Sequence, residues 1–209
     1  MLDLTQRQWV GYTVLHPFEG FEDMRWKKGG SLKIAMLIVL LGFFAAVAHD
    51  RLCGFQFRTI SSRDFSIIPY IAGTIVVFAA WVTGNWSVCT LLDGEGTMRN
   101  ICIYSAYSLV PFITQAYINV LLSHILIREE QIFMQLITLA GTLWSVIMLC
   151  SAVRAVHQYT LGKTLLAILL TIAAMAVMLC LLVLVLSLLQ QIWLFICTIY
   201  TELTYRIRV

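Results

Sequence analysis

The chain has 209 residues, of which 60% are apolar and only 12% are charged, and its formal net charge is +3. A soluble domain carries about 25% charged residues, so this composition excludes an ordinary soluble protein. Several apolar runs exceed the roughly 20 residues that a helix needs to cross a bilayer. They are too continuous for barrel strands, which alternate over about 10 residues. The sequence therefore predicts an all-α integral membrane protein in the lipid bilayer.

Charge and cysteine usage exclude several kinds of site. Basic residues near membrane ends serve orientation, so a net charge of +3 predicts no nucleic-acid partner. No pair among the six cysteines has metal-ligand spacing, and most lie in or beside apolar runs. We therefore expect no metal site, no cofactor and no disulfide framework, but buried thiols that pack as small hydrophobes.

Residues 1–30 form the first predicted segment and mix aromatic with charged side chains. After Pro17, the residues Phe18 and Phe21 recur at helical spacing, which suits the first turn of a helix. We expect a short amphipathic helix that lies in the membrane interface and ends at Gly29-Gly30. A solvated tail is the alternative, and the five aromatic residues of the segment favour the interface.

Residues 31–189 form the predicted membrane domain, a bundle of five transmembrane helices. The predicted spans cover residues 32–48, 66–82, 100–126, 132–153 and 165–189. Residues 190–209 are predicted to form an amphipathic C-terminal extension. A sixth span is the alternative, but the apolar part after Gln190-Gln191 is short and no turn separates it from the fifth span.

The distribution of basic residues predicts the orientation in the cell membrane. Lysine and arginine gather before the first span, which favours a cytoplasmic N-terminus because first spans usually dominate. With five spans, the C-terminus then lies outside. Summed over all loops the bias is weak, so this prediction rests on the first span.

Polar side chains form one stripe in the third predicted span and another in the fourth. Pro111 removes a backbone hydrogen bond, so we expect a kink there. Amides are costly in hydrocarbon unless they are paired, so the two stripes should face each other or a small wet cavity. Interhelical hydrogen bonding is the preferred interpretation, and a solute path is the alternative. The residues predicted for the kink and the polar lining are Tyr107, Pro111, Gln115, Asn119, Gln135 and Thr138.

A short acidic loop within residues 84–99 joins the second and third spans. Its Asp93-Gly94 and Glu95-Gly96 pairs are turn signals, and Thr97 can cap the helix that follows. No strand precedes the glycines and no phosphate-loop pattern is present, so a nucleotide site is not expected. Two carboxylates without histidine are poor evidence for a metal. The loop is a tight turn that can also meet the basic patch of a partner.

Residues 90–97 together with 106–111 resemble the signature of the YIP domain family, the Ypt/Rab-GTPase-interacting membrane proteins, in its bacterial branch. The residues that match are Gly94, Gly96, Thr97, Ala106, Tyr107 and Pro111. The helix after Pro17 and the five spans also fit. The resemblance implies a five-helix membrane domain with a cytosolic N-terminus, no known catalysis, and action through partner membrane proteins.

Bacterial relatives often resemble accessories encoded beside ABC-type sugar importers, so the resemblance implies an accessory or scaffold subunit. Permease subunits of a carbohydrate ABC importer are then candidate partners. The cytosolic tail of eukaryotic members, with its tyrosine-bearing motif, is absent, so a GTPase partner is not expected. The residues expected to contact the partner are Phe18, Phe21, Asp93, Gly94, Glu95, Gly96 and Thr97.

Two other functions remain as alternatives. A small-solute channel or transporter would use the polar faces of spans three and four, although no inverted repeat is evident. No ionisable residue lies in the middle of a span, so a proton- or ion-coupled pump lacks its usual carrier group. A membrane enzyme is disfavoured because no catalytic motif and no paired mid-membrane acid is present. The histidines are scattered, and only His49 and His124 are predicted near one face. We therefore expect no catalytic activity.

Overall fold

The computed structural model describes residues 5–57 and 66–208 of the chain. Every regular element in these residues is helical, which confirms the predicted all-α class. Five helical stretches are long and apolar enough to cross a membrane, as the sequence predicted, so the chain is a polytopic membrane protein. These stretches are Leu32–Leu52, Ile68–Leu91, Met98–Leu122, Arg128–His157 and Leu161–Arg206.

Two short helices precede the first span where one was expected. They are α1 (Gln8–Leu15) and α2 (Pro17–Trp26), and Pro17 opens α2 as its fixed φ favours. The helix α2 ends earlier than the predicted Gly29, because Lys28 adopts a left-handed φ of 49°. The N–H of Gly29 then closes the helix end by donating to the Met24 carbonyl at 2.8 Å.

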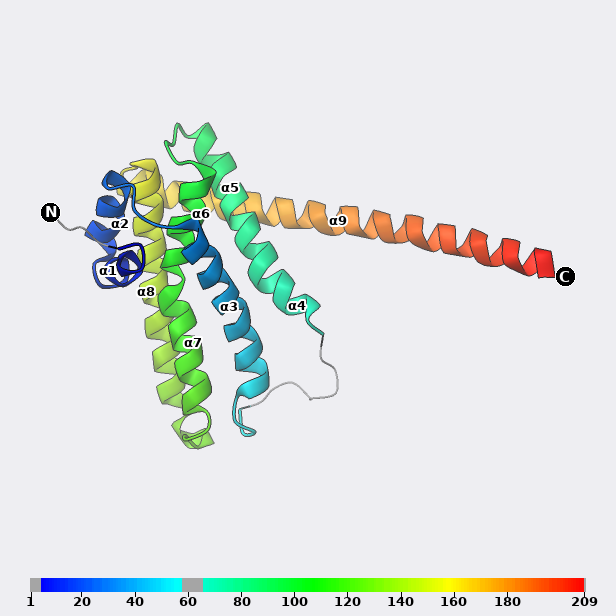
Figure 1. Ribbon diagram of the computed structural model, residues 1–209, viewed down its shortest axis with the longest axis horizontal. Helices are drawn as coiled ribbons and strands as arrows, with labels where there is room; N and C mark the ends of the chain where they lie inside the picture. The colour runs from blue at the N-terminus through cyan, green and yellow to red at the C-terminus, as the bar shows by residue number, and fades with distance from the viewer. Residues whose placement is uncertain (1–4, 58–65, 209) are drawn as a thin grey trace.

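The two N-terminal helices pack against the bundle and do not form the solvated tail that was the alternative. α2 lies against α8 (Gln131–His157), and α1 contacts α6 (Met98–Ser108). The indole N–H of Trp144, in the middle of α8, donates to the Val14 carbonyl at 3.0 Å. Since Trp144 lies about 20 Å along α8 from its last residue, α1 reaches down the side of the bundle, as Figure 1 shows.

The main core lies where these two helices meet α3 (Leu32–Leu52), α6 and α8. Phe21 and Met24 of α2 are fully buried there, together with Tyr107 of α6 and Met148 of α8. Below the core, α7 (Val110–Leu122) packs between α3 and α8, which gives the bundle its second layer (Figure 1). The last turn of α3 contains His49-Asp50-Arg51, which lie beyond the predicted span end at residue 48.

The second span consists of α4 (Ile68–Ile71), a π-helical segment η1 (Ala72–Val76) and α5 (Val77–Leu91). Its predicted end at residue 82 is wrong, and the loop expected over residues 84–99 shrinks to residues 92–97. The physical reason is that Asn85 is fully buried and hydrogen-bonded, so this polar residue continues the helix. Gly84 beside it lets α5 pack closely on α9 (Leu161–Arg208).

The third span is broken at Leu109 into α6 and α7, at the place where Pro111 predicts a kink. The break leaves the N–H of Phe112 without a helical acceptor, and this N–H donates to the Ser145 hydroxyl of α8 at 2.9 Å. The span ends at Leu122, before the predicted residue 126. The charged turn that follows is the 3-10 helix η2 (Arg128–Glu130).

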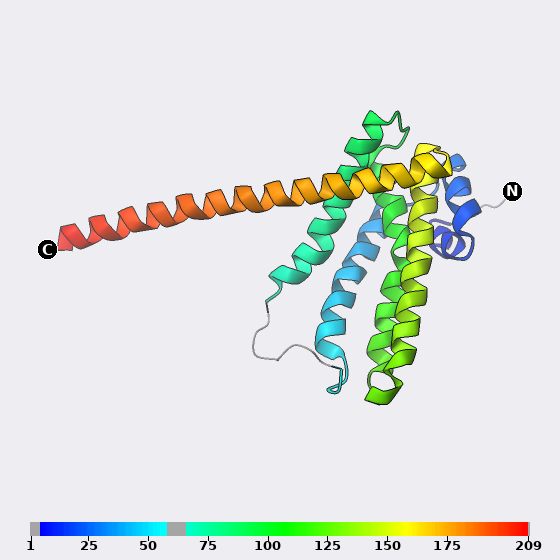
Figure 2. The same cartoon turned by 180° about the vertical axis from the view of Figure 1, so that it is seen from behind.

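The fifth span belongs to one continuous helix, α9, of 48 residues. The structure has no break at Gln190, where the sequence divided the last span from a C-terminal extension. At 1.5 Å per residue, α9 is about 72 Å long, more than twice the roughly 30 Å hydrocarbon thickness of a bilayer. Figures 1 and 2 show that α9 crosses the bundle at a steep angle and extends far beyond it.

The bond between Phe112 and Ser145 predicts a stability effect. Ser145→Ala leaves a backbone N–H unpaired inside the bundle, so we expect unfolding to become easier by about 1–2 kcal/mol. Thermal unfolding in detergent micelles, followed by circular dichroism, measures this. Ser187→Ala, on the exposed face of α9, is the matched control and should leave the midpoint unchanged. Equal midpoints for the two variants would contradict the role of the bond.

Candidate partner-docking site

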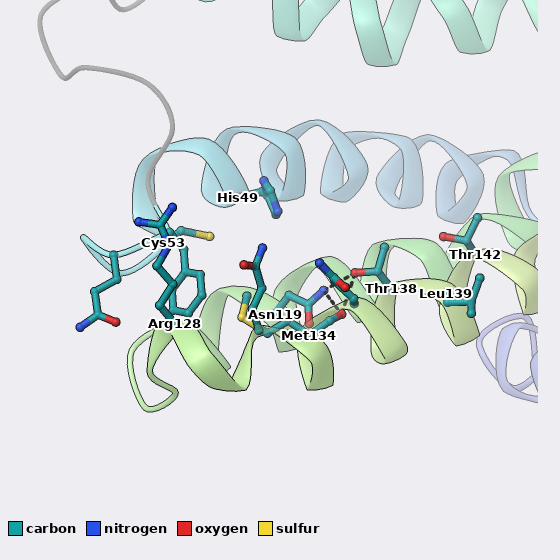
Figure 3. A pocket seen from close by; sticks show the side chains of 12 residues that line it. His49, Cys53, Asn119, Arg128, Met134, Thr138, Leu139 and Thr142 are labelled. Carbon is teal, nitrogen blue, oxygen red and sulfur yellow. Dashed lines mark hydrogen bonds between the residues drawn. The ribbon is translucent and has the colours of Figure 1, made fainter.

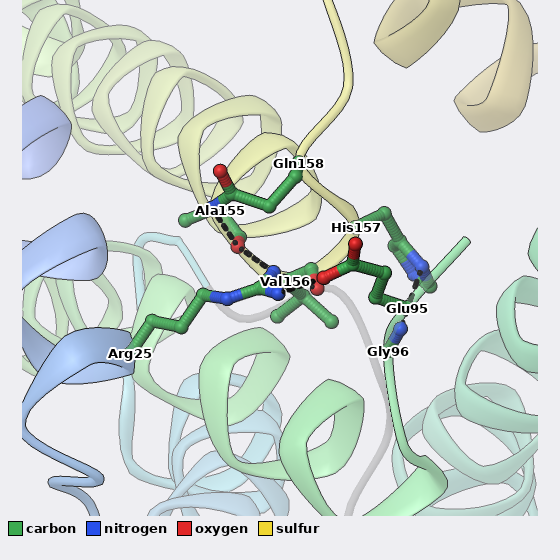
Figure 4. A network of polar contacts seen from close by, with 7 residues as sticks. All are labelled: Arg25, Glu95, Gly96, Ala155, Val156, His157 and Gln158. Atoms are coloured by element: carbon green, nitrogen blue, oxygen red, sulfur yellow. Dashed lines mark hydrogen bonds and ion pairs between the residues drawn. The ribbon is translucent and has the colours of Figure 1, made fainter.

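The Asp93 loop, defined here as residues 92–97, lies at one end of the bundle between α5 and α6. Three other parts of the chain meet it there: α2, the last turn of α8, and Tyr159 in the connection between α8 and α9 (Figures 1 and 4). The loop closes the helix on either side. The N–H of Gly94 donates to the Cys89 carbonyl at 2.8 Å. The hydroxyl of Thr97 accepts from the Asn100 N–H at 3.3 Å, which is the helix cap that the sequence predicted.

The side chains of the loop alternate between two directions. Asp93, Glu95 and Thr97 are exposed, whereas Gly94 and Gly96 face inward. A Cβ atom on Gly94 would lie 2.5 Å from Nδ1 of His157, and one on Gly96 would lie 2.5 Å from Cε1 of the same ring. Glycine is therefore required at both positions by the close approach of the loop backbone to His157, and not only by the turn.

His157, the last residue of α8, connects the loop to three helices. Its Nδ1 accepts from the Gly96 N–H at 3.3 Å, so the ring proton resides on Nε2. Nε2 donates to Oδ1 of Asn85 at 3.1 Å, and the amide of Asn85 donates to the Thr171 hydroxyl at 3.2 Å. His157, Asn85 and Thr171 are all buried. The chain of hydrogen bonds thus joins the loop, α8, α5 and α9.

Tyr159, between α8 and α9, also contacts this loop. Its ring stacks on His157 with the centroids 5.3 Å apart, and its hydroxyl lies 3.2 Å from the carbonyls of both Cys89 and Leu92. Burial, and then the neighbouring thiol of Cys89, raise the pKa of the Tyr159 phenol well above its usual range. The phenol therefore stays protonated and donates to the carbonyls that end α5.

Arg25 of α2 completes the site by bridging the loop and α8 (Figure 4). One guanidinium nitrogen donates to the carbonyls of Ala155, at 2.7 Å, and Val156, and the other pairs with the Glu95 carboxylate. The last carbonyls of a helix have no partner within it and carry the negative end of its dipole. A planar guanidinium can satisfy two carbonyls and a carboxylate together, which a lysine cannot.

Of the two aromatic residues predicted to meet a partner, only one is accessible. Phe18 is 60% exposed on the outer side of α2. Phe21 is fully buried, and its ring packs edge-on against Tyr104 with centroids 5.8 Å apart. Phe21 therefore belongs to the core and does not take the partner contact expected for it.

The predicted polar stripes lie at a separate place, toward the other end of the bundle, and they do face each other. The amide nitrogen of Asn119 donates to the Thr138 hydroxyl at 2.7 Å, and it also contacts Oε1 of Gln115 at 3.1 Å. Gln135 lines a cavity beside them (Figure 3). Tyr107 is not part of this group: its hydroxyl accepts from the Ser31 N–H at 3.2 Å, at the start of α3.

Sequence reasoning missed Arg25, Asn85, His157 and Tyr159. Only Asn85 left a signal, as a lone amide beside an apolar run that a buried partner would explain. The other three contact residues 61 to 131 positions away, such as Arg25 with Val156 and His157 with Gly96, so no local spacing reveals them. Within the described residues, no group of three or more histidine, cysteine, aspartate or glutamate side chains could hold a metal ion.

Comparison with known proteins gives one result. The model of the Yip1 domain family matches residues 12–199, which include α2, the Asp93 loop, His157 and most of α9. No curated protein and no solved structure matches the chain.

The inward glycines predict a steric effect. Gly96→Ala forces the new Cβ against His157, so we expect a loss of about 1–3 kcal/mol in the free energy of unfolding. Thermal unfolding in micelles measures it. Gly11→Ala in α1 is the matched control, because a Cβ there meets nothing within 4 Å. The control should be neutral or stabilised by up to about 1 kcal/mol. If both variants behave alike, the packing of the loop on His157 is not what requires glycine.

The guanidinium of Arg25, which contacts both Glu95 and α8, predicts how the stability losses of several variants should rank. Arg25→Ala removes the guanidinium that pairs with Glu95 and donates to two α8 carbonyls. It should therefore lower the free energy of unfolding by about 1–2 kcal/mol, more than Glu95→Ala does. The stability of Arg25→Lys should lie between those of Arg25→Ala and the wild type, because lysine keeps the charge but lacks the several N–H donors of the planar guanidinium. The double variant should cost less than the sum of the singles. Additive losses would show that Arg25 and Glu95 act separately.

Proposed function

The chain belongs to the Yip1 domain family of membrane proteins, and on this premise we propose that it is a non-enzymatic integral membrane adaptor. It binds partner membrane proteins through the Asp93 loop and the adjacent face of α2. The observation that carries this proposal is the rigid mounting of the loop. Its backbone is held by His157 and Tyr159, Arg25 pairs with its Glu95 side chain, and its outward residues remain exposed.

A rigid loop suits recognition because little conformational entropy is lost when a partner binds. The outward groups are the carboxylates of Asp93 and Glu95 and the hydroxyl of Thr97. The Glu95 side chain remains 67% exposed although it pairs with Arg25. Phe18, near the start of α2, adds an exposed aromatic ring. The matching partner surface carries a basic patch beside an apolar depression.

The site lies at the end of the bundle that we place in the cytoplasm. Lys27, Lys28 and Lys163 flank the N-terminal helices and the start of α9 at this end. Basic residues near spans favour the cytoplasmic side of the cell membrane, so we place the N-terminus and the Asp93 loop on that side. The end of α9 then lies outside if that helix crosses the bilayer once.

Permease subunits of a carbohydrate ABC importer are the specific partners that the likeness to bacterial family members suggests. A permease is itself an integral membrane protein, so it can meet both the exposed face of α2 and the Asp93 loop. This part of the proposal rests on the family likeness, and the experiment below treats importer subunits as one named outcome.

A solute path through the polar stripes is the alternative, and the packing of α7 on α8 argues against it. At the deep end of the stripes, a Cβ on Gly141 would lie 2.5 Å from Cγ of Gln115 and 3.2 Å from the Pro111 carbonyl. The two helices therefore touch there, and Gln115 is itself buried. A continuous path would need this contact to open.

The adaptor proposal predicts co-purification that depends on the loop. The tagged chain, isolated from its own host in mild detergent, should bring membrane partners in a fixed ratio by quantitative mass spectrometry. Asp93→Asn combined with Glu95→Gln keeps the size of both side chains and removes both charges. We expect recovery of the partner to fall about tenfold, the effect of losing about 1.4 kcal/mol of binding energy.

Glu129→Gln, an exposed change at the opposite end of the bundle, is the matched control and should keep full recovery. Permease and ATPase subunits in fixed ratio would support the importer assignment. Other membrane proteins would support the adaptor role and exclude the importer. Recovery of the chain alone, or of the same partners from the double variant at wild-type ratio, would refute docking at the loop.

A further inference from the structure

An apolar cavity of about 290 Å³ lies within the bundle, apart from the polar cavity of Figure 3. Two irregular turns of the membrane helices border it. The π-helical segment η1 contributes Gly73 and Thr74, and the break between α6 and α7 contributes Leu109. π-Helical turns are rare and are frequent at functional sites. A cavity whose wall contains such a turn is therefore a candidate binding site.

The cavity lies at the depth of the hydrocarbon core of a bilayer. Its wall includes Gly42, the middle residue of α3, and Trp81, near the middle of the second span. A helix that crosses a bilayer places its middle residues in the hydrocarbon core. Among the lining residues, Val77 and Phe112 are partly exposed, whereas Ile113 is buried. The cavity therefore runs inward from the surface that faces the acyl chains of the membrane.

The chemistry of the wall selects a hydrocarbon ligand. Within the part of the chain that the structure describes, no charged side chain lines the cavity. Its few polar side chains are already paired inside the protein. The Thr74 hydroxyl donates to the Tyr70 carbonyl at 2.6 Å. The indole N–H of Trp81 donates to the Ser105 hydroxyl at 3.0 Å. Ordered water needs two to four polar partners, so this cavity suits an apolar occupant and not water.

The size of the cavity fits a hydrocarbon chain and excludes a helix. An apolar cavity of about 150 Å³ can hold benzene, so a cavity of about 290 Å³ has room for about twelve carbon atoms. One turn of an α-helix, about 10 Å wide and about 5.4 Å long, fills more than about 400 Å³. A transmembrane helix, from a partner or from a second copy of this chain, is therefore too large. Phospholipid acyl chains, which make up the hydrocarbon core, meet the limit.

We propose that this cavity holds one acyl chain of a membrane phospholipid, whose headgroup stays at the bilayer surface. The chain enters past Val77 and Phe112, and its end packs on Ile113. No covalent bond forms or breaks. The proposal is independent of docking at the Asp93 loop, because no residue of that loop lines the cavity.

Photolabelling of the full chain in liposomes tests the proposal. The probe is a phosphatidylcholine that carries a diazirine at the end of one acyl chain, and mass spectrometry of the digested protein locates the label. We expect label on Ile113, which is buried and can be reached only from within the cavity. Phe44 of α3, exposed at a similar depth outside the cavity, reports labelling by the surrounding lipid and is the internal reference.

Two variants that fill the cavity should lower the label on Ile113. A Cβ at Gly73 meets nothing within 4 Å, so Gly73→Leu extends into open space. It should reduce labelling of Ile113 about tenfold relative to Phe44, because a side chain in the cavity leaves no room for the acyl chain. Val77→Phe, at a partly exposed position, should act in the same direction. Gly162→Leu, where a Cβ also meets nothing within 4 Å, is the matched control and should leave the ratio unchanged.

Circular dichroism confirms that each variant keeps its helices, and if Gly73→Leu does not fold, Val77→Phe decides the result. A wild-type chain labelled on Phe44 but not on Ile113 would overturn the proposal. Wild-type labelling of Ile113 in the folded variants would also overturn it. Loss of the Ile113 label when a free fatty acid is added at a small fraction of the phospholipid concentration would assign the cavity to a separate apolar ligand. That result would overturn the phospholipid assignment.

Discussion

The hydrogen-bonded ring of His157 is the interaction on which the end of the bundle with the Asp93 loop depends. Inside a membrane, polar groups must find partners within the protein, because lipid offers none. His157 meets this constraint by accepting from Gly96 and donating to Asn85, which in turn donates to Thr171. One imidazole thereby fixes the relative positions of a loop and three helices. The same contact explains why the loop carries glycine where its backbone touches the ring.

The two ends of the bundle satisfy this constraint to different degrees. At the end with the Asp93 loop, Arg25 and Tyr159 donate to carbonyls in the last turns of α8 and α5. At the other end, the polar stripes pair with each other through Asn119 beside an open cavity, yet its buried Oδ1 has no donor among the described residues. One end is a closed framework that presents charges outward, and the other is an open polar recess.

Much of the fold follows from local sequence, and most of the site does not. Apolar runs predict where spans lie, Pro111 predicts the break between α6 and α7, and Thr97 predicts a helix cap, because each acts through its own backbone. The second span was predicted to end too early, because an asparagine such as Asn85 is typical of a loop unless it has buried hydrogen-bond partners. Arg25 is paired with atoms 130 residues away, and such pairings depend on tertiary packing that periodicity does not encode.

The helix α9 is long and is held by the bundle only near its start. Its root is held where Thr171 receives the Asn85 amide and where Gly84 of α5 touches Met175. About 55 Å of helix lies beyond Thr171, and its side chains there are largely exposed. A tilt of about 5° at the root displaces the tip by about 5 Å over an arm of that length. The hydrogen bonds of His157 and Asn85 thus join the Asp93 loop to the part of α9 about which such a tilt would turn.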